Sequence, residues 1–212
     1  MPRIADVRPP AAPVSQEQAA RQERILDAAA RLAAADGLEH VQMHDVARAA
    51  EVAIGTLYRY FPSKTQLFAA TFRWRLRTLL AARQGPASDA RASADAVENV
   101  GDTLIEISRA LLGQPLLASA MMQSAVIEAT SAPRPAAGAV ESVLGVAVLR
   151  QLGVTEPTAD DLARARFLVF SWWGVLVSVI NDAIPDERIA DELRLAARVT
   201  LAHYADRTAA AR

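Results

Sequence analysis

The apolar residues of this chain recur with the spacing of amphipathic helices. From Gln18 onward, residues at intervals of one, three and four fall on one predicted helix face: Ile25, Ala29, Leu32 and Ala33. Gly37 comes next, at a position where helices commonly end. No segment alternates apolar and polar residues with period two, so the pattern predicts no sheet. We therefore expect an all-α protein.

Two short helices are predicted after this first helix, at 43–50 and 54–60, and residues 51–53 connect them. Two helices joined by so tight a connector form a helix-turn-helix, the motif that places its second helix in the major groove of DNA. An ordinary helical hairpin of a protein core has the same spacing. Spacing alone therefore leaves both interpretations open.

The longer helices are bounded by caps and by breaks rich in Gly and Pro. Ser63 and Gln66 have the spacing of a capping box, which predicts a helix at 64–82. Gln42, by contrast, is a weak cap for the second helix. The further helices are expected at 94–112, 115–130, 137–152, 158–182 and 186–206, which makes about nine in all.

Composition narrows the functional classes. The 212 residues are 52% hydrophobic but only 5% aromatic, and the abundant Ala and Leu favour helices. There is no cysteine, and His40, His44 and His203 are scattered in the sequence, so we expect no metal site and no cofactor.

The N-terminal segment lacks the apolar core of a signal peptide, and the longest apolar stretch, at 167–180, is too short to span a bilayer. We therefore expect a cytoplasmic protein.

Charge is distributed unevenly along the chain. The formal net charge of −1 combines a balance of +3 in residues 1–80 with −4 in residues 81–212. Residues 52–88 include no carboxylate but six basic side chains: Arg59, Lys64, Arg73, Arg75, Arg77 and Arg83. A charge run is usually a solvated face, but one that excludes acids over this length indicates binding to a polyanion.

The segment at 52–64, VAIGTLYRYFPSK, carries the candidate chemistry. Leu57 and Phe61 are four apart and would pack the short helix onto the first one. Four neighbours cannot all be buried with them and would offer donors at the surface: Thr56, Tyr58, Arg59 and Tyr60. Tyrosines with this spacing can also belong to a core, but their place beside Arg59 argues for the surface.

Gly55 and Lys64 suit the approach of a nucleic-acid backbone. Gly55 carries no side chain at the start of the short helix, so a groove or a phosphate could come close. Lys64 stands in the first turn of the next helix, where free N–H groups and the helix dipole favour an anion. A phosphate there would meet a charged donor and backbone donors together.

The run at 42–64, QMHDVARAAEVAIGTLYRYFPSK, resembles the DNA-binding signature of the TetR family of transcriptional regulators. We accordingly divide the chain into a flexible tail at 1–17, a helix-turn-helix domain at 18–63 and a helical domain for effector binding and dimerisation at 64–212. Gln42 departs from the Ser or Thr that caps the second helix in many members.

The resemblance implies that the helix at 54–60 enters the major groove of double-stranded DNA. The residues implied to lie nearest the bases are Ile54, Gly55 and Thr56. Those implied to contact the DNA backbone are Tyr58, Tyr60 and Lys64. His44 matches a position that often touches DNA. Arg59 would reach either a guanine or a phosphate.

A single helix-turn-helix makes few base contacts, so such domains usually bind two half-sites as dimers. In the last helix a stripe recurs at intervals of three and four: Ile189, Leu193, Ala196, Thr200 and His203. The small Ala196 and Thr200 would let a partner helix approach closely beside Leu193, which predicts a homodimer. The alternative is that this stripe packs on the protomer's own core.

Large apolar residues concentrate in the middle helices, where members of the family enclose an effector cavity. Six of them are candidates for its wall: Leu116, Leu117, Met121, Met122, Phe170 and Trp173. Such a cavity would take a small hydrophobic effector. Arg109, Arg150 or Arg166 would receive an anionic group at its mouth or remain in solvent. Each of the apolar residues also fits simple core packing.

Further short matches resemble the KstR subfamily of repressors of cholesterol catabolism, at 41–43, 52–64, 115–117 with Met121, and 172–173. The likeness implies an effector of lipid, steroid or acyl-CoA type. We expect a repressor that leaves a palindromic operator when its effector binds. The alternatives are an activator, a ligand-independent DNA-binding protein, or an all-α enzyme acting on a hydrophobic substrate. An enzyme would need an acid–base pair, and Glu106 and Glu128 lie in no catalytic motif.

Overall fold

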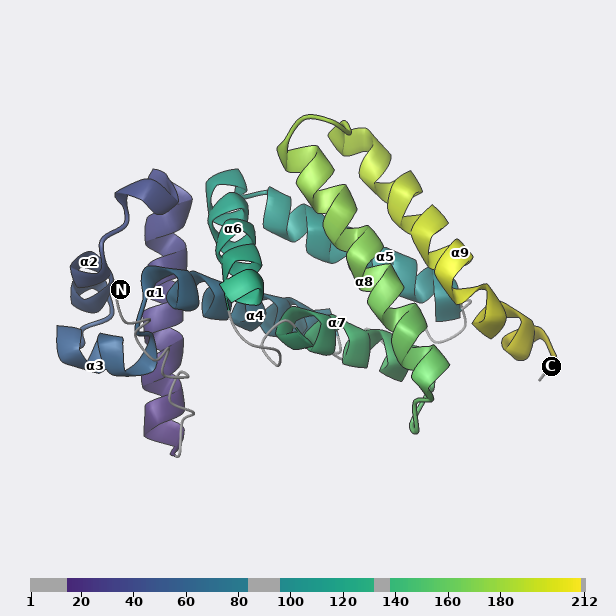
Figure 1. The fold of residues 1–212 in the computed structure, drawn as a ribbon, viewed down its shortest axis with the longest axis horizontal. Coiled ribbons are helices and arrows are strands. Elements are labelled where there is room, and N and C mark those ends of the chain that lie inside the picture. The colour runs from purple at the N-terminus through teal and green to yellow at the C-terminus, as the bar shows by residue number, and fades with distance from the viewer. Residues whose placement is uncertain (1–14, 84–95, 132–137, 211–212) are drawn as a thin grey trace, which may run out of the picture. The chain divides into compact units, whose positions relative to one another are not determined.

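The computed structural model describes residues 15–83, 96–131 and 138–210, and in these residues every regular element is a helix. In chain order (Figure 1) they are α1 (Gln16–His40), α2 (Met43–Ala49), α3 (Ile54–Tyr60), α4 (Lys64–Arg83), α5 (Ala96–Leu112), α6 (Pro115–Ser131), α7 (Gly138–Gln151), α8 (Ala159–Ile180), the short 3₁₀ helix η2 (Asp186–Arg188) and α9 (Ile189–Ala210). The prediction of an all-α fold is confirmed for this part of the chain.

The helix boundaries lie close to those predicted, and the differences have local causes. α1 begins at Gln16 because the Ser15 side chain accepts a hydrogen bond from the Gln18 N–H (3.2 Å) and caps the helix. Gly37 interrupts α1 as expected, with a φ of 77°, but the helix continues beyond it to His40. The predicted tail at 1–17 therefore gives way to helix at residue 16, and its first fourteen residues lie outside the described part.

The chain forms two compact units, and neither is a single run of sequence. The first holds α1, α2, α3, the start of α4 as far as Trp74, and α6. α6 packs along α1, and α2 packs on both α1 and α3 (Figure 1). Its core includes Ile25, Val46, Leu57, Phe61, Phe68 and Leu117. The predicted boundary between the DNA-binding and effector-binding domains, at residue 64, remains a prediction. The two compact units divide the chain later, within α4, after Trp74.

The second unit holds the rest of α4 with α5, α7, α8, η2 and α9. α9 packs along α5 and α8, and α7 packs against the same two helices. Trp172 is fully buried at its centre, and its indole N–H donates to Ser108 Oγ at 2.9 Å. The first turn of α8 is fixed by a capping box between Thr158 and Asp161. The hydrogen bond from Trp172 and the cap at Thr158 fix α8 in this unit.

α8 is long and apolar enough to cross a membrane, by length and composition alone. Its 22 residues include a window with a mean hydropathy of 1.4, so the apolar stretch is longer than the segment at 167–180. Core helices of globular proteins meet the same criterion. Leu168, Trp172 and Leu176 of α8 are buried in the second unit, although only 33% of the apolar window is buried in all.

Candidate functional site

α2 and α3 form the predicted helix-turn-helix. The chain turns between them at Glu51, whose φ of 54° is left-handed, and the Val52 N–H bonds back to the Ala47 carbonyl (3.0 Å). Neither helix has a side-chain cap, because Gln42 and Ala53 make no such hydrogen bond. The weak cap expected at Gln42 is confirmed.

α3 has a buried face and an exposed face. Leu57 and Phe61 are fully buried, as predicted, and hold in place a helix of seven residues that would not be stable alone. The other face exposes Ile54, Gly55, Tyr58 and Arg59, with Thr56 half-buried. No described atom outside its chain neighbours lies within 4 Å of the position that a Cβ on Gly55 would take. A large partner can therefore approach this face closely.

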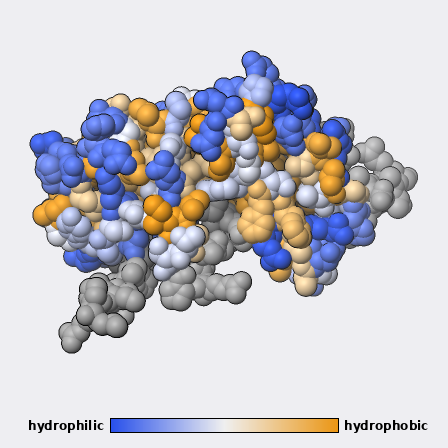
Figure 2. All heavy atoms as spheres, turned by 45° about the horizontal axis from the view of Figure 1, so that its top comes forward, coloured by the Kyte–Doolittle hydropathy of each residue, from blue (hydrophilic) through white to orange (hydrophobic). Residues whose placement is uncertain are grey.

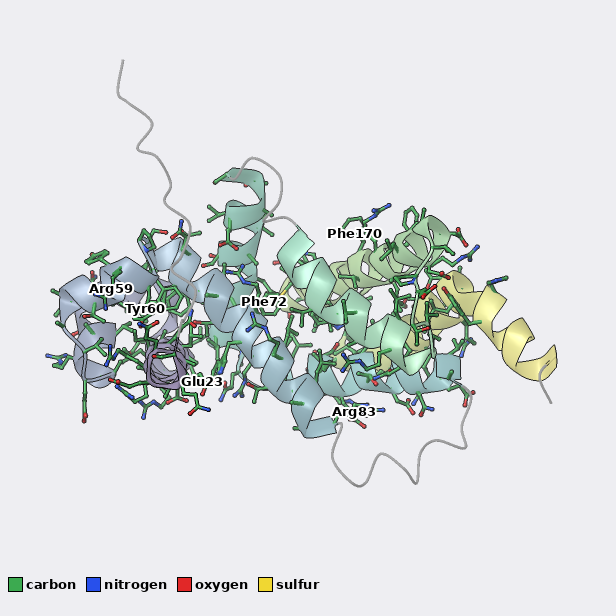
Figure 3. The ribbon with its side chains drawn as sticks, turned by 90° about the horizontal axis from the view of Figure 1, so that it is seen from below. Glu23, Arg59, Tyr60, Phe72, Arg83 and Phe170 are labelled. Atoms are coloured by element: carbon green, nitrogen blue, oxygen red, sulfur yellow. The ribbon has the colours of Figure 1, made fainter. Side chains whose placement is uncertain are left out.

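Tyr60 does not lie on the exposed face. It is only 3% exposed, its ring centroid lies 6.3 Å from that of Phe61, and the Arg59 guanidinium lies 5.7 Å from its centroid (Figure 3). Tyr60 follows Leu57 by three residues, and residues three apart share a helix face. The expectation of a surface Tyr60 is wrong, and its assignment to a phosphate loses its basis.

Lys64 is already bonded within the protein. Its half-buried ammonium donates to the carbonyl oxygens of Leu38 (2.8 Å) and Val41 (3.0 Å) at the end of α1. A lysine ammonium has three donors, so two of them are occupied. One donor remains for a phosphate, and the expected contact between Lys64 and the DNA backbone stays a prediction.

The start of α4 forms half of the predicted capping box. Ser63 Oγ accepts a hydrogen bond from the Gln66 N–H (3.1 Å), which confirms the cap. The reciprocal bond is not formed, because Gln66 Oε1 is buried without a hydrogen-bond partner among the described residues. The N-terminus of α4 is therefore held by Ser63 and not by Gln66.

His44 is exposed in the first turn of α2, in the same unit as α3. Its Nε2 lies 3.1 Å from the carboxylate of Asp45, which also accepts a hydrogen bond from Arg48 (2.6 Å). A DNA contact by His44 would therefore take place beside a carboxylate already shared with Arg48.

Two arginines of the acid-free segment are paired with carboxylates distant in sequence. Arg73 pairs with Glu128 of α6, and each side chain is only 14% exposed. Arg83 pairs with Glu106 of α5. The segment at 52–88 is therefore less positive in the fold than in the sequence. The two carboxylates considered for acid–base chemistry are salt-bridge partners and belong to different units.

The six residues predicted to line an effector cavity are divided between the units. In the first unit Leu117, Met121 and Met122 are buried, whereas Leu116 is exposed. In the second unit Trp173 is half-buried, and Phe170 is exposed at the outer edge of α8 (Figure 3). Leu116 and Phe170 are thus not enclosed within their own units, and the predicted cavity remains a prediction.

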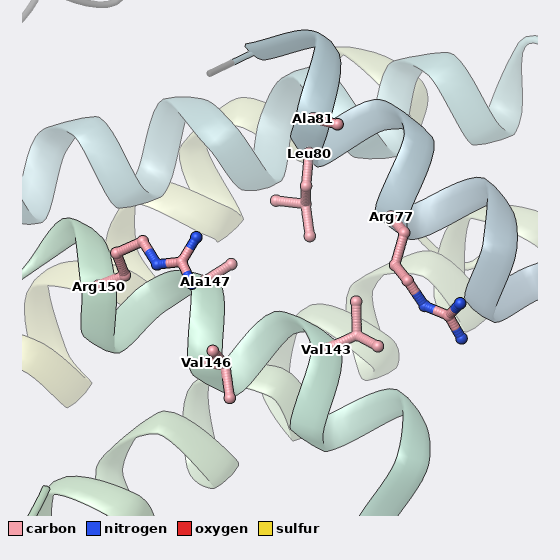
Figure 4. Close-up of a pocket in the computed structure, with 7 residues that line it drawn as sticks. All are labelled: Arg77, Leu80, Ala81, Val143, Val146, Ala147 and Arg150. Atoms are coloured by element: carbon pink, nitrogen blue, oxygen red, sulfur yellow. The ribbon is translucent and has the colours of Figure 1, made fainter.

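A cavity of about 410 Å³ that is widely open to solvent lies between α4 and α7 in the second unit (Figure 4). It is lined by Arg77, Leu80 and Ala81 of α4 and by Val143, Val146, Ala147 and Arg150 of α7. Arg77 and Arg150 stand on opposite sides of the apolar lining, and neither forms an ion pair or hydrogen bond with a described residue (Figure 4).

None of the six predicted wall residues lines this cavity, although Arg150 was one of three arginines considered for an anionic group. A signal for the α7 wall was present in the sequence, because its four residues recur at intervals of three, one and three on one helix face. The pattern did not indicate that this face opposes α4.

The stripe predicted for dimerisation lies partly inside the protomer. Leu193 is fully buried, because the core row of α9 runs through Ile189, Leu193, Ala197 and Leu201. Its assignment to the dimer interface is wrong, while Ala196 and Thr200 are half-buried. The exposed large apolar residues of the two last helices are Leu195 and Val199 (68%) on α9 and Leu162, Phe167 (60%), Phe170 and Val177 on α8. Apolar surface also gathers in patches on the face drawn in Figure 2.

Comparison with known proteins places both halves of the chain in one group. Residues 25–71 match the family model "Bacterial regulatory proteins, tetR family", and residues 93–200 match "Tetracyclin repressor-like, C-terminal domain". The HTH-type transcriptional repressor KstR of Rhodococcus jostii (strain RHA1) is 33% identical over 187 residues, which cover 88% of this chain and 85% of the relative.

Solved structures agree with this. A TetR transcriptional regulator from Rhodococcus sp. RHA1 is 37% identical, with a TM-score of 0.74 over 88% of this chain and 97% of that chain. FadR of Thermus thermophilus, in complex with lauroyl-CoA, is 21% identical, with a TM-score of 0.62 over 85% of this chain and 93% of that chain. The second likeness shows a shared fold.

Proposed function

Because the chain belongs to the TetR family of bacterial regulatory proteins, we propose that it is a cytoplasmic homodimeric repressor that leaves a palindromic operator when a small hydrophobic effector binds. Family membership confirms the resemblance of the segment at 42–64 and makes the chain a DNA-binding transcriptional regulator. It also sets the enzyme hypothesis aside, since the family consists of regulators. An activator would share the same DNA-binding face, and a reporter assay distinguishes the two.

The exposed face of α3 is the observation that carries DNA binding. Tyr58 and Arg59 offer donors there, and the open space at Gly55 lets a groove come close to the backbone. Ile54 and Thr56 can contact thymine methyl groups, and Arg59 can reach a guanine or a phosphate. We expect His44 of α2 to add a contact from the same unit. Few of these groups read base edges, so base readout by each protomer is sparse.

Substitution of Gly55 by Ala tests this face without disturbing the fold. The added methyl group meets open space in the protein, so stability should hold or rise, as Ala favours helix more than Gly does. It should weaken operator binding by about tenfold, comparable with the loss of one good base contact. The operator is first selected from random DNA duplexes, and binding is then measured by fluorescence anisotropy.

Gly145→Ala in α7 is the matched control, because its new Cβ meets only Ala165 Cβ at an ordinary 4.0 Å. That variant should bind the operator like the wild type. Selection that yields no preferred sequence, or binding that does not weaken with salt, would contradict the proposed function.

The exposed apolar residues of α8 and α9 support a homodimer. Phe167, Phe170, Gly174 and Val177 recur on α8 at intervals of three and four and so share one face. Clusters of exposed apolar side chains of this kind mark protein interfaces. Phe167→Asp with Phe170→Asp should give a monomer by light scattering, whereas Val126→Asp, an exposed apolar site on α6, should not. A wild-type monomer would contradict the homodimer, and a dimeric double variant would contradict this interface.

The cavity between α4 and α7 supports an effector with an apolar body and an anionic group. Its volume lies within the usual range of about 300–1,000 Å³ for ligand sites. Arg77 and Arg150 suit a carboxylate or a phosphate, which guanidinium groups bind with paired hydrogen bonds. α4 belongs to both units, so displacement at the cavity can reach its first residues. FadR binds a ligand of this type, lauroyl-CoA.

Operator release tests the effector class directly. Lauroyl-CoA and dodecanoate, which are anionic, should release labelled operator at lower concentrations than dodecanol, which is neutral. Arg150→Gln should raise the concentration of the anionic ligands needed for half-release. Arg109→Gln, an exposed arginine of α5, is the control and should not raise it. Equal action of dodecanol and dodecanoate would contradict the role of the two arginines.

A further inference from the structure

Gly55 and Arg59 occupy the centre of the exposed face of α3. They are four residues apart, so they share one side of the helix. At about 3.6 residues per turn, this side lies roughly opposite the three buried residues of the segment, Leu57, Tyr60 and Phe61. Because α3 is held on its buried side, a groove that receives the helix would meet the side of Gly55 and Arg59 first.

The remaining residues of α3 lie on the flanks of this face. Ile54 and Tyr58, again four apart, are displaced to one side, and Thr56, which is half-buried, lies on the other. The floor of the major groove carries the base edges, and its walls carry the phosphates. The flanks of α3 are therefore closer to the DNA backbone, and its centre is closer to the bases.

Of the two central residues, Arg59 has the side chain that can read a base. Gly55 contributes no side chain, and a Cβ added there would meet open space. The backbone of α3 can therefore enter a groove deeply, which brings the long side chain of Arg59 within reach of the floor. A guanidinium group matches the O6 and N7 atoms of guanine with two hydrogen bonds.

The guanidinium group of Arg59 is not engaged by a carboxylate. In the described part of the chain the Arg59 side chain is exposed and forms no ion pair or hydrogen bond, whereas Arg48 of α2 donates to Asp45 (2.6 Å). The guanidinium carbon lies 5.7 Å from the centroid of the buried Tyr60 ring (Figure 3). A cation–π contact at an exposed site is weaker than a bidentate bond to guanine, so the ring would not keep Arg59 from a base.

We propose that Arg59 is the main base-reading residue of each protomer and that it recognises a guanine in the major groove of the operator. The proposal rests on the proposed function, because it concerns operator binding. It names guanine, and not a phosphate, as the partner of Arg59, while Tyr58 on the flank contacts the backbone. A guanine of each half-site should then account for much of the sequence selectivity.

Substitution of guanine by 7-deazaguanine in the selected operator tests this contact at a single atom. The analogue keeps Watson–Crick pairing and lacks the N7 acceptor. At one guanine of each half-site it should weaken wild-type binding by about tenfold, the effect of losing a good base contact. Arg59→Ala should bind the unmodified operator about tenfold more weakly, and the analogue should weaken it no further. If the analogue affected both proteins equally at every guanine, the proposal would be overturned.

The dependence of affinity on salt distinguishes a base from a phosphate. Loss of one phosphate contact reduces the magnitude of the slope of log K against log salt concentration by about 0.9. Arg59→Ala should leave this slope close to that of the wild type and relax the base preference at one position of each half-site. A slope reduced by about 0.9, with the base preference unchanged, would assign Arg59 to a phosphate and overturn the proposal.

Two further variants sharpen the measurement of base preference. Glutamine pairs with adenine in the major groove, so Arg59→Gln should lose the preference for guanine at that position and favour adenine. Tyr58→Phe is the control on the flank and should weaken binding to all sequences alike. A preference for guanine that survives in Arg59→Gln, or that disappears in Tyr58→Phe, would contradict the assignment.

Failure of this proposal differs from failure of the proposed function. A wild type that selects no sequence would reject both. An operator that is bound selectively but contains no G·C pair, or whose guanines all tolerate 7-deazaguanine, would reject only the role of Arg59.

Discussion

α3 and α8 both expose aromatic side chains, yet the two helices are held in place in different ways. α3 has seven residues and no side-chain cap, and depends on the burial of Leu57 and Phe61. α8 has 22 residues, begins with a capping box at Thr158 and buries Trp172 completely. Exposed aromatic residues therefore do not all indicate the same kind of partner. The neighbouring residues on each helix indicate whether to expect DNA or another protein surface.

The surroundings of the exposed rings support this distinction. Tyr58 stands beside Arg59 and the open space at Gly55, which suits a polyanion with a groove. Phe167 and Phe170 form an apolar stripe with Val177, which suits another protein surface. The buried faces carry the stability of both helices, and the exposed faces are available for binding.

The largest expected effect is on the buried face of α8. Trp172→Ala should lower the free energy of unfolding by about 3–5 kcal/mol, because it opens a cavity and removes the donor to Ser108. Tyr58→Ala on the exposed face of α3 should change it by less than about 0.5 kcal/mol while weakening DNA binding. Urea denaturation and anisotropy measure the two quantities. Similar losses of stability in both variants would contradict the distinction between the buried face of α8 and the exposed face of α3.

The next effect concerns the ion pair that joins α4 to α6. Glu128→Gln should destabilise the protein by about 2–3 kcal/mol, because it leaves the Arg73 guanidinium without its carboxylate, although both groups retain some access to solvent. Replacing both residues by Met should recover much of this loss. Chemical denaturation of the single and double variants checks the prediction, and equal stability of the two would contradict it.

A smaller effect appears only at high pH. Burial, together with the hydrogen bond to Asp161, raises the pKa of Tyr204 from its ordinary value of 10.0 to about 12. The unfolded chain therefore loses this proton before the folded protein does. The associated stabilisation is complete below pH 10 and is lost as the pH rises towards 12.

Tyr204→Phe removes this ionisation. The difference in unfolding free energy between wild type and variant should shrink as the pH rises from 10 to 12, measured by urea denaturation at each pH. A difference that stays constant over this range would show that Tyr204 titrates alike in both states.

The smallest effects concern the helix caps. Thr158→Ala should cost about 1 kcal/mol, because it removes the acceptor for the Asp161 N–H. Ala53→Ser should stabilise the protein by about 0.5–1 kcal/mol by giving α3 the cap that it lacks. Thermal denaturation is sensitive enough for both. A destabilising Ala53→Ser would mean that the start of α3 cannot adopt capping geometry.

Local features of the sequence predicted much of this protein. Helix boundaries, the Ser63 cap, the break at Gly37 and the burial of Leu57 and Phe61 follow from patterns over three or four residues. The segment at 42–64 indicated the family, because its residue types are specific as a set. The exposure of Ile54, Tyr58 and Arg59 agreed with that expectation.

Tertiary structure decided which face of each helix is buried and which charges are paired. Leu193 proved to be buried because α9 carries apolar residues on more than one side and does not reveal its core face in sequence, whereas the spacing of Tyr60 from the buried Leu57 did indicate its face. The separation of 55 positions between Arg73 and Glu128 likewise exceeds the reach of any local pattern. Lys64 bonds to carbonyls more than twenty residues earlier in the chain. The cavity required two helices to face each other, a relation set by packing across the whole unit.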